Sequence, residues 1–336
     1  MPPLHPEQGF STVPVAGEIK DYGAKAVSNQ GRHPIGLGIR VPTIVVSPWS
    51  RGGYVSSELF DHTSVVRFVE KRFGVREPNV SDWRRAVTGG LTGAFDFAKP
   101  DAAESTPNFG RARDFQQRIH LSAAGAAIAI PAVQQPAEAM RGTRPARPLP
   151  YAFTVDGAVT PEGRFRLAMR NGGVAGVTLT VHDASDRRGP WHYTIGAGHA
   201  HESEQWHEAG PIEDYDLIVR GPNGFLQRYA GAIDGTADAR LKTTPQRAEI
   251  HLTNRAATPQ VLTVALDEAY AADSPLQTVS VASGATAVSA WSLARSDGWY
   301  DLTVRSAADR SFLCRFAGST GSRNTDPAIG RMRLTA

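Results

Sequence analysis

Four polar residues between positions 50 and 62 have side chains that could take part in catalysis. Ser50 and Arg51 follow a short apolar run, and Asp61 and His62 lie at the predicted start of a helix. A hydrolytic site combines a nucleophile, carboxylate or imidazole groups, and cationic groups that stabilise the developing charge. In open α/β sheets, ligands bind beyond the carboxyl ends of the strands, where Ser50 and Arg51 would lie. These four residues are the candidate catalytic residues.

A structural role explains two of them without any chemistry, and the spacing favours it. Aspartate is a preferred helix N-cap, because its carboxylate accepts a hydrogen bond from a free backbone N–H of the first turn. In that interpretation Asp61 caps the helix, and His62 is a buried histidine that orders the preceding loop. Both interpretations stay open at the level of the sequence.

The surrounding pattern predicts a strand, a loop and a helix. Residues 43–46 form a β-branched apolar run, typical of a strand buried on both faces of a parallel sheet. The predicted helix runs to about Phe73, with valines at helical spacing, and Gly74 supplies its C-terminal stop. One such unit cannot bury both faces of a sheet by itself. It is therefore a piece of an α/β layer.

Histidines cluster between positions 192 and 207. His199 and His201, two residues apart on a predicted strand, would share one face and are candidate metal ligands. His192 and His207 lie nearby. The alternative is an exposed hairpin without a metal, because the equivalent stretch of a second copy, described next, has no histidine.

The second half of the chain contains a duplicated unit of roughly 85 residues, the signature of a structural repeat. Residues 215–220 and 225–231 (YDLIVR, FLQRYAG) return as residues 300–305 and 312–318 (YDLTVR, FLCRFAG). Apolar residues alternate with polar ones along several short segments, which predicts β-sandwiches. The predicted repeats are 149–235 and 243–333, after an Ala/Pro-rich linker at 119–148. Exposed aromatic residues would suit a binding module, and the candidates are Trp191, Tyr193 and Trp299.

Composition excludes several classes of protein. The 336 residues carry a net charge of +3, with no basic run interleaved with aromatics, so we expect no nucleic-acid partner. The single cysteine, Cys314, cannot form an internal disulfide and is predicted to pack in the core. The N-terminal residues lack the features of a signal peptide, and no apolar stretch is long enough for a membrane helix.

Two regions resemble bacterial phosphocholine-specific phospholipases C, a group within a phosphoesterase family that also contains acid phosphatases. The first comprises VVSPWSRGGY at 45–54 and FDHTSV at 60–65, and continues through WRRAV at 83–87 and AFDF at 94–97. The second comprises GTRPAR at 142–147 and both copies of the repeat. The resemblance covers nearly the whole chain, with the two regions in the family's order.

The resemblance implies a fold of the α/β plus all-β class. Residues 1–118 would complete an alkaline-phosphatase-like α/β domain, followed by two tandem β-sandwiches. It implies hydrolysis of phosphatidylcholine or sphingomyelin to phosphocholine, with phospholipid or a membrane surface as partner. The family's hydroxyl nucleophile and divalent-metal carboxylates lie in an N-terminal region that this sequence does not match.

We therefore expect the C-terminal half of such an enzyme, from a truncated or split gene. Alone, it should bind no metal of its own and be inactive, and the N-terminal catalytic half is a possible partner. The alternative is a non-catalytic module that binds lipid, glycan or protein. Family members are usually secreted or periplasmic, whereas this chain, without a signal peptide, would stay cytoplasmic if expressed alone.

Overall fold

The computed structural model describes residues 2–3, 6–21, 31–98, 114, 116–118, 142–185, 188–207, 212–271 and 275–328. Most of the predicted linker, 119–141, lies outside the described residues. Within them, strands dominate and helices are few, which confirms a largely β protein with a small helical part. No helix among these residues is long and apolar enough to cross a bilayer.

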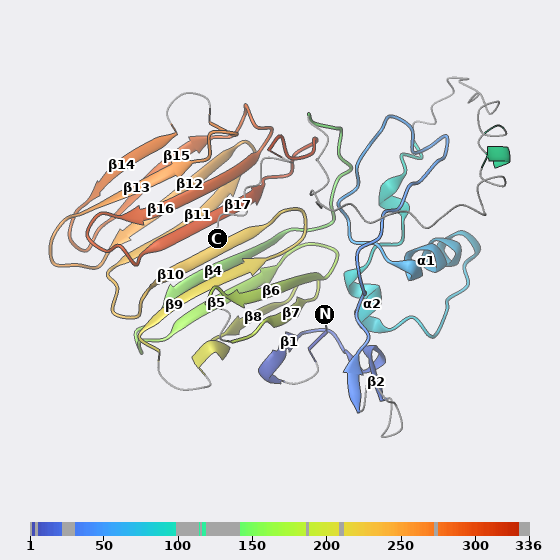
Figure 1. Ribbon diagram of the computed structural model, residues 1–336, viewed down its shortest axis with the longest axis horizontal. Coiled ribbons are helices and arrows are strands. Elements are labelled where there is room, and N and C mark those ends of the chain that lie inside the picture. Colours follow the sequence, from blue (N-terminus) through green and yellow to red (C-terminus); the bar gives the residue numbers. More distant parts are fainter. Residues whose placement is uncertain are drawn as a thin grey trace.

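The second half folds into two β-sandwiches that share one sheet (Figure 1). In the described part of the chain, each repeat has the same succession of seven strands. The first repeat contains β4 (Phe153–Val159), β5 (Phe165–Asn171), β6 (Val177–Asp183), β7 (Trp191–Ile195), β8 (Ala200–Ser203), β9 (Asp214–Arg220) and β10 (Leu226–Ala232). The second contains β11 (Ala237–Thr244), β12 (Arg247–Asn254), β13 (Gln260–Leu266), β14 (Leu276–Val281), β15 (Thr286–Ser292), β16 (Trp299–Ser306) and β17 (Leu313–Ser319).

Strands β10 and β17 join the repeats around a local two-fold axis. The large sheet runs β1-β7-β6-β9-β10-β17-β16-β13-β14, so the strand order of one repeat is reversed in the other. Arg228 lies opposite Arg315, its equivalent in the other copy, and the pairing is antiparallel. The smaller sheets, β4-β5-β8 and β11-β12-β15, cover the two halves of this sheet. Their inward residues form one continuous core across both repeats.

The duplicated sequence, residues 215–231 and 300–318, forms the same hairpin in each repeat. Tyr215 pairs across the strands with Gly231, and Tyr300 pairs in the same way with Gly318. A Cβ atom at Gly231 would lie only 3.0 Å from the Tyr215 hydroxyl, so glycine makes room for the ring. In each hairpin, an aspartate that both copies share accepts two hydrogen bonds from the arginine of the same copy. The lengths are 2.8 and 2.6 Å in each copy, for Asp216 with Arg228 and for Asp301 with Arg315.

The first half contains little regular structure. The elements whose bounds are described there are the strands β1 (Gly9–Ser11), β2 (Ile19–Asp21) and β3 (Arg32–Pro34) and the α-helices α1 (His62–Phe73) and α2 (Asp82–Val87). Among the described residues, the 3₁₀-helices are η1 (Pro6–Gln8), η2 (Ala16–Glu18), η3 (Thr92–Ala94) and, in the first repeat, η4 (Gln205–His207). Helix α1 has the predicted ends, because Asp61 caps its start and Gly74 adopts the left-handed conformation (φ 70°) at its end.

The predicted buried strand at 43–46 is wrong. These residues form no strand, and the side chains of Ile44 and Val46 are 87% and 91% exposed. A lone β-branched segment cannot form a sheet without neighbouring strands. Within the described residues none is placed beside it.

Helix α1 turns its apolar side to solvent. Val65, Val69 and Phe73 recur at helical spacing, and each is at least 49% exposed. Its inward side is instead more polar, with Ser64 fully buried and Arg67 bonded to the Thr88 carbonyl. A helix on the surface of a folded domain normally buries its apolar side and exposes its polar side.

The first half is attached firmly to the first repeat. Strand β1 adds to the edge of β7 in parallel, and Trp83 of α2 is fully buried with its indole N–H donating to Thr194 Oγ1 at 2.9 Å. Residues 145–147 contact both halves, because Val55 bridges Ala146 and the Ala146 N–H donates to the Arg323 carbonyl. Residues 145–147 of the predicted linker are therefore held by contacts with both halves, whereas residues 142–144 are exposed.

Candidate functional site

Ser50 and Arg51 lie in a turn after the extended segment. The Ser50 hydroxyl bonds the carbonyls of Val45 at 3.0 Å and Ser47 at 3.3 Å, and it therefore orders this turn. Arg51 is exposed, followed by Gly52 and Gly53 in left-handed conformations. Both partners of the Ser50 hydroxyl are backbone carbonyls, and neither is a general base.

Asp61 performs the structural role that its sequence context permits. Its carboxylate accepts from the Ser64 N–H at 3.2 Å and from Thr63 Oγ1 at 2.7 Å, while Ser64 Oγ accepts from the Asp61 N–H. It also forms an ion pair with Arg84. Burial alone would raise the pKa of Asp61, but the hydrogen bonds and the Arg84 charge outweigh it and lower the pKa. His62 is exposed, so its predicted burial is wrong.

Arg84 is the centre of a buried ion network that the sequence did not reveal. It donates to Glu18 at 3.0 and 2.6 Å and to the Gly36 carbonyl at 2.7 Å, in addition to Asp61. The side chains of Glu18 and Asp61 are 3% and 5% exposed. The network ties η2, α1 and α2 together. Its members lie up to 66 positions apart, so no local pattern could link them.

A second unpredicted carboxylate, Glu58, lies against two glycines. A Cβ atom at Gly89 or Gly93 would collide with its carboxylate oxygens. Burial raises the pKa of Glu58, and the nearby charge of Arg67 opposes that rise. A raised pKa favours acid–base chemistry, but among the described residues Glu58 belongs to no group of three or more His, Cys, Asp or Glu side chains that could hold a metal ion.

The candidate metal ligands do not converge. His199 is exposed and its Nδ1 contacts the Ala197 carbonyl at 2.9 Å, whereas the His201 ring stacks on Phe10 at 4.1 Å. Burial lowers the pKa of His201. Nowhere in the described ranges do three or more His, Cys, Asp or Glu residues gather as a metal would require. The residues present therefore do not fit a metal centre.

The histidine cluster is not the exposed hairpin that the sequence predicts. His207 is buried in η4, and its Nε2 accepts the Phe165 N–H at 2.8 Å, which fixes its neutral form. His192 is half-buried on β7, and burial lowers its pKa to about 4. Both histidines are structural members of the first repeat.

The candidate binding aromatics are buried, so their predicted exposure is wrong. Trp191 packs edge-on against Trp206, and the Tyr193 hydroxyl donates to Gln205 at 3.0 Å. The Trp299 indole N–H donates to the Asn324 carbonyl at 3.0 Å. Trp191, Tyr193 and Ile195 alternate along β7, a period-two signal that indicates a common core-facing side. Cys314 is buried as predicted, and burial raises the pKa of its thiol.

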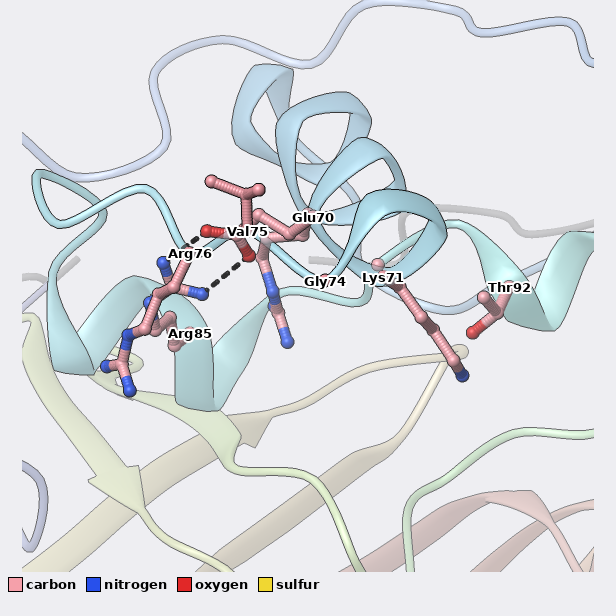
Figure 2. Close-up of a pocket in the computed structure, with 9 residues that line it drawn as sticks. Glu70, Lys71, Gly74, Val75, Arg76, Arg85 and Thr92 are labelled. Carbon is pink, nitrogen blue, oxygen red and sulfur yellow. Dashed lines mark hydrogen bonds and ion pairs between the residues drawn. The ribbon is translucent and has the colours of Figure 1, made fainter.

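A pocket of about 450 Å³ lies between the end of α1, the following turn and α2 (Figure 2). Its cationic lining residues are Arg67, Lys71, Arg76 and Arg85. Arg85 binds Glu70 at 2.9 and 2.7 Å, and that hydrogen bonding helps to lower the pKa of Glu70 to about 2. With four cationic side chains and one carboxylate, the lining favours anions over cations.

The fold defines a largely β protein with two tandem sandwich repeats and a partly helical first half. Two tandem sandwiches adjoin a partial helical segment, and the described residues assemble no catalytic set. The comparison with known families agrees. Residues 145–232 and 236–319 match the bacterial phospholipase C, C-terminal domain, and residues 4–76 match the phosphoesterase family. The chain belongs to this phospholipase C family.

Its relatives are about twice as long. Non-hemolytic phospholipase C of Burkholderia pseudomallei is 38% identical, over 98% of this chain and 48% of that protein. The protein of that name from Pseudomonas aeruginosa is 39% identical, over 90% of this chain and 45% of the relative. Hemolytic phospholipase C of Pseudomonas aeruginosa is 32% identical, over 98% and 49%. The chain thus spans about half the length of the curated relatives it matches.

Proposed function

We propose that this chain is the C-terminal portion of a phospholipase C that hydrolyses phosphatidylcholine or sphingomyelin to phosphocholine. The observation that carries the proposal is the match of nearly the whole chain to two proteins named non-hemolytic phospholipase C. The nucleophile and the metal-binding carboxylates come from the half of these relatives that the chain does not match. The sandwiches and α2 form the rigid base on which that half is completed.

The chain by itself is inactive in this proposal. Ser50 and Asp61 are engaged in a turn and in a helix cap, and within the described ranges no three His, Cys, Asp or Glu side chains gather as a metal site would require. The alternative, a binding module with exposed aromatics, loses its main support because Trp191, Tyr193 and Trp299 are buried.

The test measures hydrolysis of a chromogenic phosphocholine ester with added divalent metal. The purified chain should release no more chromophore than buffer. The same chain co-expressed with the unmatched half of the Burkholderia pseudomallei relative should hydrolyse the ester. Hydrolysis by the chain alone that disappears in Ser50→Ala or His62→Ala would overturn the proposal, with Ser283→Ala in the second repeat as the matched control.

A further inference from the structure

Among the described residues, most of the exposed large apolar side chains lie in the first half of the chain. We call the open face the surface formed by Val41, Ile44 and Val46 of the extended segment and Val65, Val69 and Phe73 of α1. Their exposed fractions run from 49% to 91%. Across the described part of the sandwiches, such residues occur only singly, for example Val174 and Val288. Large exposed apolar patches mark interaction sites.

Aromatic contacts connect the two parts of the open face. Trp49, just after the extended segment, lies 6.0 Å from Phe97 between ring centroids. Phe97 stacks on Phe95 at 5.3 Å, and Phe95 stacks at 5.3 Å on Phe68 of α1. The Asp96 N–H also donates to the Trp49 carbonyl at 2.7 Å. Segment and helix thus belong to one surface, on the side of the molecule away from the sandwiches (Figure 1).

The backbone of the extended segment identifies the kind of occupant. Between residues 41 and 46, no backbone N–H donates to an acceptor within the described residues. Apart from Pro42, every residue of this segment is β-branched, which is the composition of a strand. A sheet edge would satisfy both the free N–H groups and the apolar side chains. A bilayer would bury the side chains and leave the N–H groups unsatisfied, at a high cost.

We propose that the open face docks the α/β phosphoesterase polypeptide that makes up the unmatched half of the relatives. Residues 41–46 add as a strand to the edge of its sheet, and the valines and Phe73 of α1 cover one side of that sheet. The apolar side of α1, which faces solvent in the free chain, would then face the sheet of a completed domain, as in an ordinary surface helix. This inference rests on the proposed function for the identity of the partner, but it concerns association rather than hydrolysis.

The experiment co-expresses the tagged full chain with the unmatched half of the Pseudomonas aeruginosa non-hemolytic relative. After affinity capture, we expect about one partner per wild-type chain. The Ile44→Asp/Val69→Asp variant should capture at least tenfold less, because it places two charges in a dry interface. Val174→Asp/Val288→Asp, with two exposed apolar residues of the sandwiches replaced, is the matched control and should capture as well as wild type.

Hydrogen exchange provides a second readout. Amides of residues 41–46 should exchange at least tenfold more slowly in the complex than in the free chain, because strand addition protects them. Equal capture by the open-face variant, unprotected amides, or no captured partner with the wild-type chain would overturn the proposal. Binding of the free chain to phosphatidylcholine vesicles that the same variant abolishes would also overturn it, in favour of a lipid surface. Capture without hydrolysis would leave the docking intact and reject the proposed activity.

Discussion

Asp61 shows how one residue type can serve two purposes that the sequence cannot separate. Its position before the helix made it a candidate catalytic carboxylate and a candidate N-cap. The structure supports the cap, because both halves of the capping box are formed and Arg84 occupies the other carboxylate oxygen. A carboxylate held in this way stabilises the fold near α1, and its substitution would act on folding before it acted on chemistry.

Removing Arg84 should destabilise the first half strongly. Arg84→Met would leave Glu18 and Asp61 as buried carboxylates without their cation, which costs about 3–5 kcal/mol of unfolding free energy. Urea denaturation followed by tryptophan fluorescence would measure the loss. Arg240→Met, at a half-exposed pair with Asp238 in the second repeat, should change stability by less than about 1 kcal/mol. A similar, small effect for both variants would contradict the expectation.

The Arg84 contribution should also fade at low pH. Because the folded-state pKa of Asp61 is lowered, its stabilisation is present above the unfolded-state value, near 4, and is lost as the pH falls through the lower folded value. The difference between wild type and Arg84→Met should therefore shrink below about pH 4. A difference that stayed constant from pH 7 to pH 3 would exclude Asp61 as a partner that Arg84 keeps ionised.

At the scale of elements, the ends of a helix follow from local signals, whereas a strand depends on neighbours that lie far along the chain. The ends of α1 follow from Asp61 and Gly74, which act within one turn. The 43–46 run has the composition of a strand, but strand formation depends on neighbours that this chain does not place beside it. The alternation along β7 indicated a buried face. The prediction that Trp191 and Tyr193 are exposed did not take this two-residue alternation into account.

In the hairpin of the repeated sequence, we predict that position 231 requires glycine. In Gly231→Ala the new methyl group would press on the Tyr215 hydroxyl, and we expect a loss of about 1–3 kcal/mol in unfolding free energy. Adding Tyr215→Phe should recover part of the lost stability, because it removes the hydroxyl oxygen that the new methyl group would contact. Thermal or urea unfolding of the four proteins of this double-mutant cycle measures the coupling.

Gly172→Ala is the control for this cycle. A Cβ atom there would have an ordinary contact of 3.7 Å with the Ala152 carbonyl, so its effect should be within about 0.5 kcal/mol. Additive effects of Gly231→Ala and Tyr215→Phe would show that the ring and the glycine do not fit one another as described.

At the scale of the whole molecule, the two sandwiches behave as one unit in the structure. Their core is continuous, and Tyr229 meets Phe316 edge-on at 5.9 Å across the β10–β17 junction. The sequence predicted two repeats because each has its own periodicity. It could not predict the shared sheet, because the pairing of β10 with β17 joins residues about 87 positions apart and leaves no local mark.

One cooperative transition should therefore describe the unfolding of both repeats. Leu167 and Leu302 are fully buried, one in each repeat, and Leu→Ala at either should cost about 2–5 kcal/mol. Differential scanning calorimetry should show both variants lowering the midpoint of the same transition. Two resolved transitions, with each variant shifting a different one, would show that the repeats unfold independently.

The local two-fold axis between the repeats has a consequence for the origin of the chain. Equivalent residues facing each other across antiparallel strands, as Arg228 and Arg315 do, are the mark of a symmetric homodimer. Duplication and fusion of an ancestral single-repeat gene would convert that dimer into one polypeptide. Its pairing would then survive dilution, since tethered partners meet at an effective concentration in the millimolar range. The two copies were also free to diverge, and the histidines that the first copy alone carries between residues 192 and 207 record that freedom.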